Sequence, residues 1–302
     1  MASMAEELEI KLSLEPDILV QAHSWLSAQP EAEEGSTKSL INCYYDTPGA
    51  ELNQQHAALR VRQAGDQYIQ TLKTRGDFVD GAHRRQEWEW PVTGPTLSPG
   101  LLADTPLGER VNLARLTSVF ETNFTRQVIM LDDGEAVIEC ALDDGFIAAG
   151  GQQKPLHEVE FELVSGDPKR LLVWAQRLAR ACPVFLNLVS KAEQGYQLAG
   201  LAVSELTAAE NTGTKANGED DLDRFLKRLS NAWLEQGRVS LEGLDIQVLA
   251  AQAEAYGLGQ AFAEVIDALA ERQPVQALLG KPELGQCQLG LLAYRAGLSL
   301  SA

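Results

Sequence analysis

The chain has 302 residues, of which 45% are hydrophobic and 23% are charged, as in a globular protein with a sizeable core. Its formal net charge of −18 argues against a nucleic-acid or anionic-membrane partner, because neither would attract so acidic a body. We expect a cytoplasmic protein without disulfides or a zinc site, since no basic-and-apolar leader, long apolar run or CxxC pair occurs.

The first predicted element is a strand in which charged and apolar residues alternate. Glu7, Glu9 and Lys11 would share one face of this strand and the apolar residues between them the other, since side chains alternate between faces. Taken alone, this pattern also fits a half-buried strand at the surface. A helix is predicted next, at 15–29, with Pro16 near its start.

The strand-like stretches that follow repeat the alternation with charges of both signs. Arg60 and Arg62 flank one apolar residue, and Glu158 and Glu160 flank another. Several strands of this kind could enclose a polar interior inside an apolar shell. Gly and Asp residues between many of the stretches indicate antiparallel hairpins. The predicted strands lie at 39–45, 57–63, 68–74, 84–91, 123–131, 135–142, 145–149 and 157–163.

Helical patterns dominate the rest of the chain. Asp167 and Pro168 begin a helix that runs to about residue 181, and 190–201 could form another short helix. Residues 204–219 are polar and rich in Gly, Asn and Thr, which is typical of a linker. Four further helices are predicted at 221–236, 244–256, 260–272 and 282–296.

Three segments follow from these patterns. They are a first domain at 1–203, a linker at 204–219 and an all-helical domain at 220–302. The helical domain shows no active-site pattern, so we interpret it as a scaffold or oligomerisation module that could make the chain a homo-oligomer.

The charged motifs follow one another in a definite order along residues 1–201. They are Glu7-x-Glu9-x-Lys11, Leu59-Arg60-Val61-Arg62, Thr71-Leu72-Lys73, Glu87, Arg126, Glu158-Val159-Glu160-Phe161 and Ser190-Lys191. This ordered set resembles the CYTH superfamily of triphosphate tunnel metalloenzymes, whose signature is ExExK. Three further segments resemble its bacterial branch of inorganic triphosphatases: Tyr44-Tyr45-Asp46-Thr47-Pro48, Leu163-Val164-Ser165-Gly166-Asp167 and Ser190-Lys191-Ala192-x-x-Gly195-Tyr196.

The resemblance implies an α+β fold. An eight-stranded antiparallel β-barrel, the triphosphate tunnel, would carry flanking helices and be followed by the smaller all-α C-terminal domain. Closure of the barrel removes the free edges of the sheet. Bacterial members often have a helical extension, sometimes a CHAD domain, but residues 220–302 lack the histidines typical of CHAD domains. We therefore assign no polyphosphate binding to them.

The resemblance also implies roles for the charged residues. Arginines would bind the phosphate chain as bidentate donors and lysines as point charges; the residues are Arg60, Arg62, Lys73, Arg85, Arg126 and Lys191. Arg85 could equally be a rim charge. Carboxylates would hold Mg²⁺ or Mn²⁺, which prefer oxygen ligands; these are Glu7, Glu9, Asp143, Glu158 and Glu160. Lys11, beside the first two, would act with them in catalysis by orienting the attacking water or protonating the leaving group.

We predict a divalent-metal-dependent inorganic triphosphatase that converts tripolyphosphate to pyrophosphate and phosphate. Thiamine triphosphatase, nucleoside triphosphatase and adenylate cyclase are alternatives within the superfamily, and each would need a pocket for an organic group. A non-catalytic polyphosphate-binding module is the alternative from another class. The chain contains neither a GxxxxGK[ST] loop nor a GxSxG elbow, so other catalytic classes gain little support.

Overall fold

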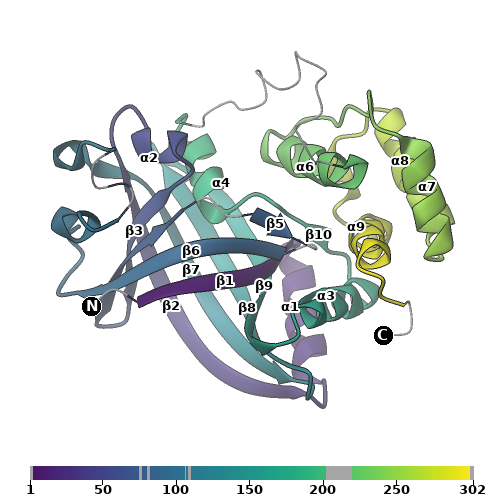
Figure 1. Ribbon diagram of the computed structural model, residues 1–302, viewed down its shortest axis with the longest axis horizontal. Coiled ribbons are helices and arrows are strands. Elements are labelled where there is room, and N and C mark those ends of the chain that lie inside the picture. The colour runs from purple at the N-terminus through teal and green to yellow at the C-terminus, as the bar shows by residue number, and fades with distance from the viewer. Residues whose placement is uncertain are drawn as a thin grey trace.

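A computed structural model describes residues 3–74, 77–79, 82–105, 107, 110–201 and 220–299, with side chains at all of these except 3–6, 77–79 and 83–85. Within this part of the chain, ten antiparallel strands form one sheet (Figure 1). The strands are β1 (Ser3–Ser13), β2 (Ala32–Asp46), β3 (Ala58–Ala64), β4 (Gln67–Lys73), β5 (Asp77–Val79), β6 (Ala82–Val92), β7 (Thr117–Asp132), β8 (Ala136–Ala149), β9 (Gln152–Gly166) and β10 (Phe185–Leu186).

The first strand connects the two sides of the sheet. Residues 3–9 of β1 pair with β6, and residues 9–13 pair with β9. The pairings therefore run from β1 through β9, β8, β7, β2, β3, β4 and β6 and return to β1. Figure 1 shows these strands curving around a common interior. The predicted antiparallel, barrel-like fold is confirmed, with β5 and β10 as short additions.

The predicted strand limits were wrong in two ways. First, the strands predicted at 135–142 and 145–149 are one strand, β8, which spans Ala136–Ala149. The strand continues through residues 143–145, and a Cβ at Gly145 would lie 2.1 Å from the carbonyl oxygen of Asn123 in β7. Glycine therefore permits the close approach of the two strands. Second, β2, β7 and β9 begin at residues 32, 117 and 152, earlier than the predicted 39, 123 and 157. The first half of β2 has no apolar alternation because residues 33–39 are exposed on both faces.

Helices cover the outer face and one end of the sheet (Figure 1). In the described residues they are α1 (Pro16–Ser27), α2 (Glu51–Gln54), α3 (Lys169–Ala181), α4 (Lys191–Leu198), α6 (Asp221–Leu234), α7 (Ile246–Ala255), α8 (Gly259–Ala270) and α9 (Pro282–Arg295), with 3-10 turns at Pro99–Leu102, Leu113–Arg115 and Val275–Leu278. The four helices predicted after residue 220 are all present, within a few residues at each end.

The apolar face of the sheet shares one hydrophobic core with the helices. Ile10 of β1 and Phe161 of β9 belong to the same buried cluster as Trp174 of α3, Phe225 of α6 and Leu291 of α9. The C-terminal helices therefore pack directly against α3 and β10. The predicted linker at 204–219 lies outside the described residues, and the division into two domains stays a prediction.

The helix α4 packs over the opposite, inward face of the sheet at one end. Tyr196 of α4 lies edge-on to Phe120 of β7, with ring centroids 5.0 Å apart, and Phe120 stacks on Tyr44 of β2 at 4.5 Å. This close approach requires a glycine: a Cβ at position 195 would lie 2.1 Å from the ring of Phe120.

Gly195→Ala is therefore expected to lower the free energy of unfolding by about 1–3 kcal/mol, the usual cost of forcing an extra methyl group into a packed core. Urea denaturation of the wild type and the variant would measure the change. Gly49→Ala is the control, because nothing lies within 4 Å of its new Cβ. Equal losses of stability in the two variants would contradict this account of α4.

Candidate active site

The strand register gathers the predicted charged residues on one face of the sheet. Opposite residues of an antiparallel pair project from the same face. Lys11 lies opposite Glu160, and Asp143 lies between Arg126 and Glu158 on its two neighbours. Lys11, Asp143 and Glu158 are at most 2% exposed. This face is therefore the interior, and the predicted concentration of charge inside an apolar shell is present.

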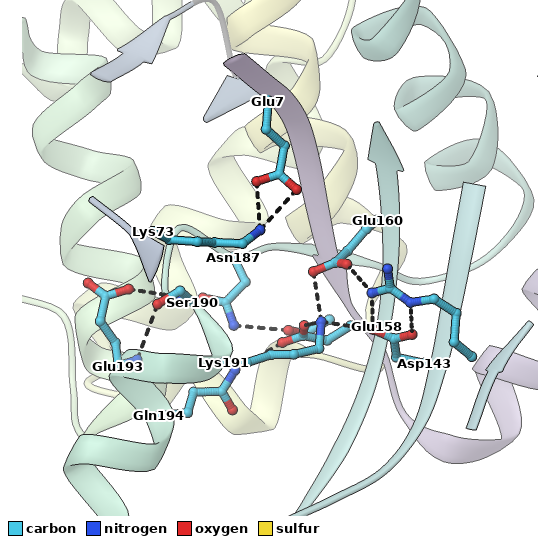
Figure 2. A network of polar contacts seen from close by, with 12 residues as sticks. Glu7, Lys73, Asp143, Glu158, Glu160, Asn187, Ser190, Lys191, Glu193 and Gln194 are labelled. Carbon is cyan, nitrogen blue, oxygen red and sulfur yellow. Dashed lines mark hydrogen bonds and ion pairs between the residues drawn. The ribbon is translucent and has the colours of Figure 1, made fainter. Parts of the chain in front are cut away.

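One network in the interior is centred on Lys191 (Figure 2). Its ammonium lies 2.9 Å from Asp143, 2.7 Å from Glu158 and 2.7 Å from Glu160. Arg126 binds Asp143 with two hydrogen bonds of 2.7 Å and reaches Glu160 at 2.5 Å. Two cations are thus shared among three buried carboxylates.

The charges in this network strengthen one another. Burial alone would lower the pKa of Lys191, but the charges of Asp143, Glu158 and Glu160 raise it well above its ordinary value. Burial alone would likewise raise the pKa of Glu160, but Lys191 and Arg126 hold it well below its ordinary value. Both groups are therefore charged at neutral pH.

Local sequence places Lys191 at the start of α4. The hydroxyl of Ser190 accepts a hydrogen bond from the backbone N–H of Glu193, and the Glu193 carboxylate accepts one from the backbone N–H of Ser190. This capping box makes Ser190 the N-cap and Lys191 the first residue of the helix. Gln194, on the same helix, donates a hydrogen bond of 2.9 Å to Glu158.

A second network lies between β1, β3, β4 and β6. Lys73 donates to both carboxylate oxygens of Glu7, at 2.7 and 3.0 Å, and lies 3.4 Å from Glu87. Arg60 lies 3.8 Å from the other oxygen of Glu87. Glu87, one of the residues of the ordered motifs, is thus paired with basic residues here.

The two arginines of β3 are oriented by uncharged residues that the sequence analysis missed. Arg62 donates to the side-chain oxygen of Asn42 at 2.8 Å, and Arg60 donates to the hydroxyl of Tyr44 at 3.4 Å. Asn42, Tyr44 and the β3 arginines lie opposite one another in the β2–β3 register. The two-residue period of β2 was the available signal, but uncharged polar residues with that period are common in strands.

Arg62 lies in surroundings with an excess of positive charge. Burial, together with the charges of Arg60 and Arg126, lowers the pKa of Arg62 to about 10. A bound anion would remove this unfavourable interaction, and the forked guanidinium groups suit the oxygens of a phosphate.

The opposite wall of the interior has an excess of negative charge. Burial and the neighbouring carboxylates Glu7 and Glu9 raise the pKa of Glu162 to about 8, although Lys73 partly counteracts them. Glu9 and Glu162 lie opposite each other in the register of β1 and β9. A cation near these carboxylates would relieve their mutual repulsion.

The donor chemistry of this wall fits a hard divalent cation. Its groups are carboxylate oxygens, the ligands that such ions prefer. Among the described residues, no three Asp, Glu, His or Cys side chains are grouped as a preassembled metal site. Glu7 is paired with Lys73, and Asp143, Glu158 and Glu160 with Lys191 and Arg126. The carboxylates are chemically suitable ligands for the ion, and some of them would give up an ion pair with a lysine or arginine to bind it.

Two predicted sites need separate comment. Arg85 lies opposite Glu7 in the pairing of β6 with β1, but its side chain is outside the described part of the structure. Asp46, in the motif that resembles bacterial triphosphatases, is structural. It accepts hydrogen bonds from the backbone N–H groups of Thr47 and Leu52 and from the hydroxyl of Tyr196.

Comparison with known proteins agrees with this architecture. The family model described as the CYTH domain matches residues 5–196. The chain belongs to the CYTH family. The resemblance seen in the ordered motifs is thereby confirmed.

The inorganic triphosphatase of Haemophilus influenzae is 33% identical to the CYTH chain over 196 residues, which are 65% of this chain and 55% of that protein. The chain thus covers little more than half the length of this relative. A Hippeastrum protein, studied as a candidate adenylyl cyclase and described as having a dominant triphosphatase activity, is 19% identical, with a TM-score of 0.51 over 63% of this chain and 95% of that one. At this identity the likeness shows the fold alone.

All four cysteines are free thiols. In the described parts of this CYTH chain, none of the helices combines the length and apolar character needed to cross a bilayer.

Lys191→Met should lower the free energy of unfolding at pH 7 by about 3–5 kcal/mol, because it leaves buried carboxylates without one of their cations. In the wild type, the pKa of Glu160 is lower in the folded than in the unfolded state, so its ionised form stabilises the fold at a pH above its unfolded-state pKa. This stabilisation is lost as the pH falls through its folded-state pKa. In the variant, protons can replace the missing positive charge. Its deficit relative to the wild type should therefore shrink between pH 7 and pH 5.

Urea titrations at both pH values would test this expectation, with the exposed Lys169→Met as the control. A deficit for Lys191→Met that stayed constant with pH would contradict the ion-pair network.

Proposed function

We propose that this CYTH protein is a divalent-metal-dependent inorganic triphosphatase that converts tripolyphosphate to pyrophosphate and phosphate. One observation carries the proposal: the ring of paired strands encloses Arg62, crowded by Arg60 and Arg126, together with the crowded carboxylates of Glu7, Glu9 and Glu162. A polyphosphate chain accompanied by a divalent cation would balance both.

The basic residues would bind and orient the phosphate chain. Arg60, Arg62 and Arg126 can offer paired N–H donors, and Lys73 and Lys191 contribute single charges. Asn42 and Tyr44 already hold two of the arginines by hydrogen bonds. Phosphoryl transfer depends mainly on such positioning and on neutralising the phosphoryl oxygens, so this arrangement suits the reaction.

The carboxylates would hold the metal and act on the water. Glu7 and Glu9, with Glu158, Glu160 and Asp143, are the residues that would ligate Mg²⁺ or Mn²⁺. When bound, the ion would neutralise phosphate oxygens and lower the pKa of a bound water. Lys11 is buried between the carboxylates of β1 and β9, where its ammonium could orient the attacking water or protonate the leaving phosphate.

The choice of tripolyphosphate rests on similarity. The Haemophilus influenzae relative is named as an inorganic triphosphatase. Hydrolysis of an organic triphosphate, nucleotide cyclisation and metal-independent polyphosphate binding are the alternatives. The carboxylate wall argues against the last, because an anion sensor needs the basic residues more than the acidic ones. A cytoplasmic location and homo-oligomerisation through α6–α9 stay predictions.

Phosphate release should be fastest from tripolyphosphate, compared with ATP and thiamine triphosphate under the same conditions. We expect it to require Mg²⁺ or Mn²⁺ and to stop with excess chelator. Glu7→Gln/Glu9→Gln should reduce the rate by at least about 10²-fold, as expected when groups that stabilise charge in the transition state are lost. Colorimetric phosphate determination would follow the reaction.

Each other outcome identifies an alternative. Faster release from an organic triphosphate would retain the mechanism and change the substrate. Pyrophosphate together with a cyclic nucleotide from ATP would indicate a cyclase. Binding of tripolyphosphate without any metal requirement or turnover would indicate a binding module and overturn the proposed enzyme.

Mg²⁺ alone should stabilise the folded protein, because the carboxylate wall is assembled in the native state and dispersed in the unfolded chain. At 100 times the dissociation constant the gain would be about 2.7 kcal/mol. Thermal unfolding at increasing Mg²⁺ concentration would measure it. Glu7→Gln/Glu9→Gln should lose most of the shift; an equal shift in that variant would place the ion elsewhere.

A further inference from the structure

The C-terminal helices hold the segment that leads into α4. Gln288 of α9 is fully buried, and its carboxamide makes two hydrogen bonds with the backbone of Leu186 in β10. The amide oxygen accepts from the Leu186 N–H at 2.9 Å, and the amide nitrogen donates to the Leu186 carbonyl at 3.0 Å. Buried backbone groups without partners are costly, so this side chain fixes the position of β10.

Two other contacts connect the helices to the same segment. Gly285 lies one turn before Gln288, and a Cβ there would lie 2.2 Å from the carbonyl oxygen of Val184, so α9 is in close contact with the chain at this point. Ser230 of α6 accepts a hydrogen bond of 3.0 Å from the backbone N–H of Leu188. Gln288 and Ser230 thus hold alternate residues of one extended stretch.

The stretch held in this way continues directly into the interior. The backbone N–H of Asn187 donates to the carbonyl of Lys11 at 3.0 Å. The side-chain amide of Asn187 donates to the hydroxyl of Ser13 at 2.9 Å. Ser190 then begins α4, and Lys191 reaches its three carboxylates (Figure 2). Only four residues lie between Leu186, which α9 holds, and Lys191, whose ammonium is in the interior.

A cavity of about 280 Å³ is lined both by the helical region and by residues that surround Lys191. Trp233 at the end of α6 and Leu279 line one part of it, and Glu158 and Gln194 line another. Trp233 also stacks on Phe185 of β10, with ring centroids 6.2 Å apart. The helical region therefore reaches both the chain before Lys191 and the partners of Lys191.

We propose that Gln288 is a positioning residue that acts through Lys191, and that the C-terminal helices are in this way a structural part of the phosphate-binding site. Gln288 sets the path of β10, β10 sets the start of α4, and the start of α4 sets the ammonium among Asp143, Glu158 and Glu160. The proposal rests on the proposed function, in which Lys191 binds the phosphate chain.

The test compares two matched variants of the full-length protein. Gln288→Met removes both hydrogen bonds to β10 while nearly keeping the side-chain volume. Gln176→Met removes two hydrogen bonds at the same interface, between α3 and the hydroxyl of Tyr256, the residue that follows α7, and these bonds do not involve β10 or α4. We expect Gln288→Met to raise the KM for tripolyphosphate about tenfold and to leave kcat within about twofold of the wild-type value. A tenfold change corresponds to the free energy of one to two hydrogen bonds. Gln176→Met should leave KM unchanged.

A double-mutant cycle identifies the route. In a Lys191→Met background, Gln288→Met should raise KM no further, because the residue through which it acts is already absent. Three results would each overturn the proposal. They are additive effects of Gln288→Met and Lys191→Met on KM, an unchanged KM in folded Gln288→Met, and an equal rise of KM in Gln176→Met. Ser230→Ala, which removes a single hydrogen bond to Leu188, replaces Gln288→Met if that variant does not fold.

Hydrogen exchange separates this proposal from the proposed function. Without any substrate, the backbone amides of α4 should exchange faster in Gln288→Met than in the wild type, and at the wild-type rate in Gln176→Met. Unchanged α4 exchange in Gln288→Met would overturn the positioning role even in an active enzyme. If α4 exchanges faster in Gln288→Met but the wild-type protein hydrolyses no triphosphate, the coupling between Gln288 and α4 is retained and the proposed function is refuted.

Discussion

The separation of charge inside the sheet is the constraint on which the rest of the structure depends. On one wall, burial and the charges of Arg60 and Arg126 lower the pKa of Arg62, and on another, burial and the charges of Glu7 and Glu9 raise the pKa of Glu162. Between them, Lys191 and Arg126 are paired with three carboxylates at distances of 2.5–2.9 Å. Burying so many charges is unfavourable unless they are paired or bound to a ligand. The fold therefore has to hold each wall firmly in place.

The curved sheet and the packing of its outer face hold the two walls in place. Because side chains alternate along each strand, charges on the interior face require apolar residues on the outer face. On β1, β8 and β9 that outer face packs against α1, α3 and the C-terminal helices, and on β3, β4 and β6 it packs against Leu52, Leu102 and Leu107, so the apolar shell offsets part of the cost of the charged interior. The pairing of β1 with both β6 and β9 brings the two walls together around one space.

Much of this could be predicted from the sequence, because the signal was local. The two-residue period placed Glu7, Glu9 and Lys11 on one face, and the order of the motifs indicated the family. The partners of these residues could not be predicted in the same way. Asn42 and Gln194 are ordinary polar residues in their elements, and their roles appear when strands and helices distant in sequence meet. The break predicted at residues 143–144, just before Gly145, was wrong because a glycine at a close approach between strands and a glycine in a turn give the same local pattern.

The limits of local reasoning are clearest at α4, which carries Lys191. Its capping box could be read from Ser190 and Glu193, but the box fixes where the helix begins in the sequence and leaves its place in space undetermined. That place depends on contacts at both ends. At the far end, Tyr196 donates to Asp46, and Gly195 lies against Phe120.

At the near end, Gln288, about a hundred residues further along the chain, holds β10 through its backbone. The motifs around Asp46 and Ser190 are therefore parts of one support for a single lysine. The C-terminal helices complete that support, so a change deep in α9 reaches the interior through the backbone of β10 without touching a charged residue.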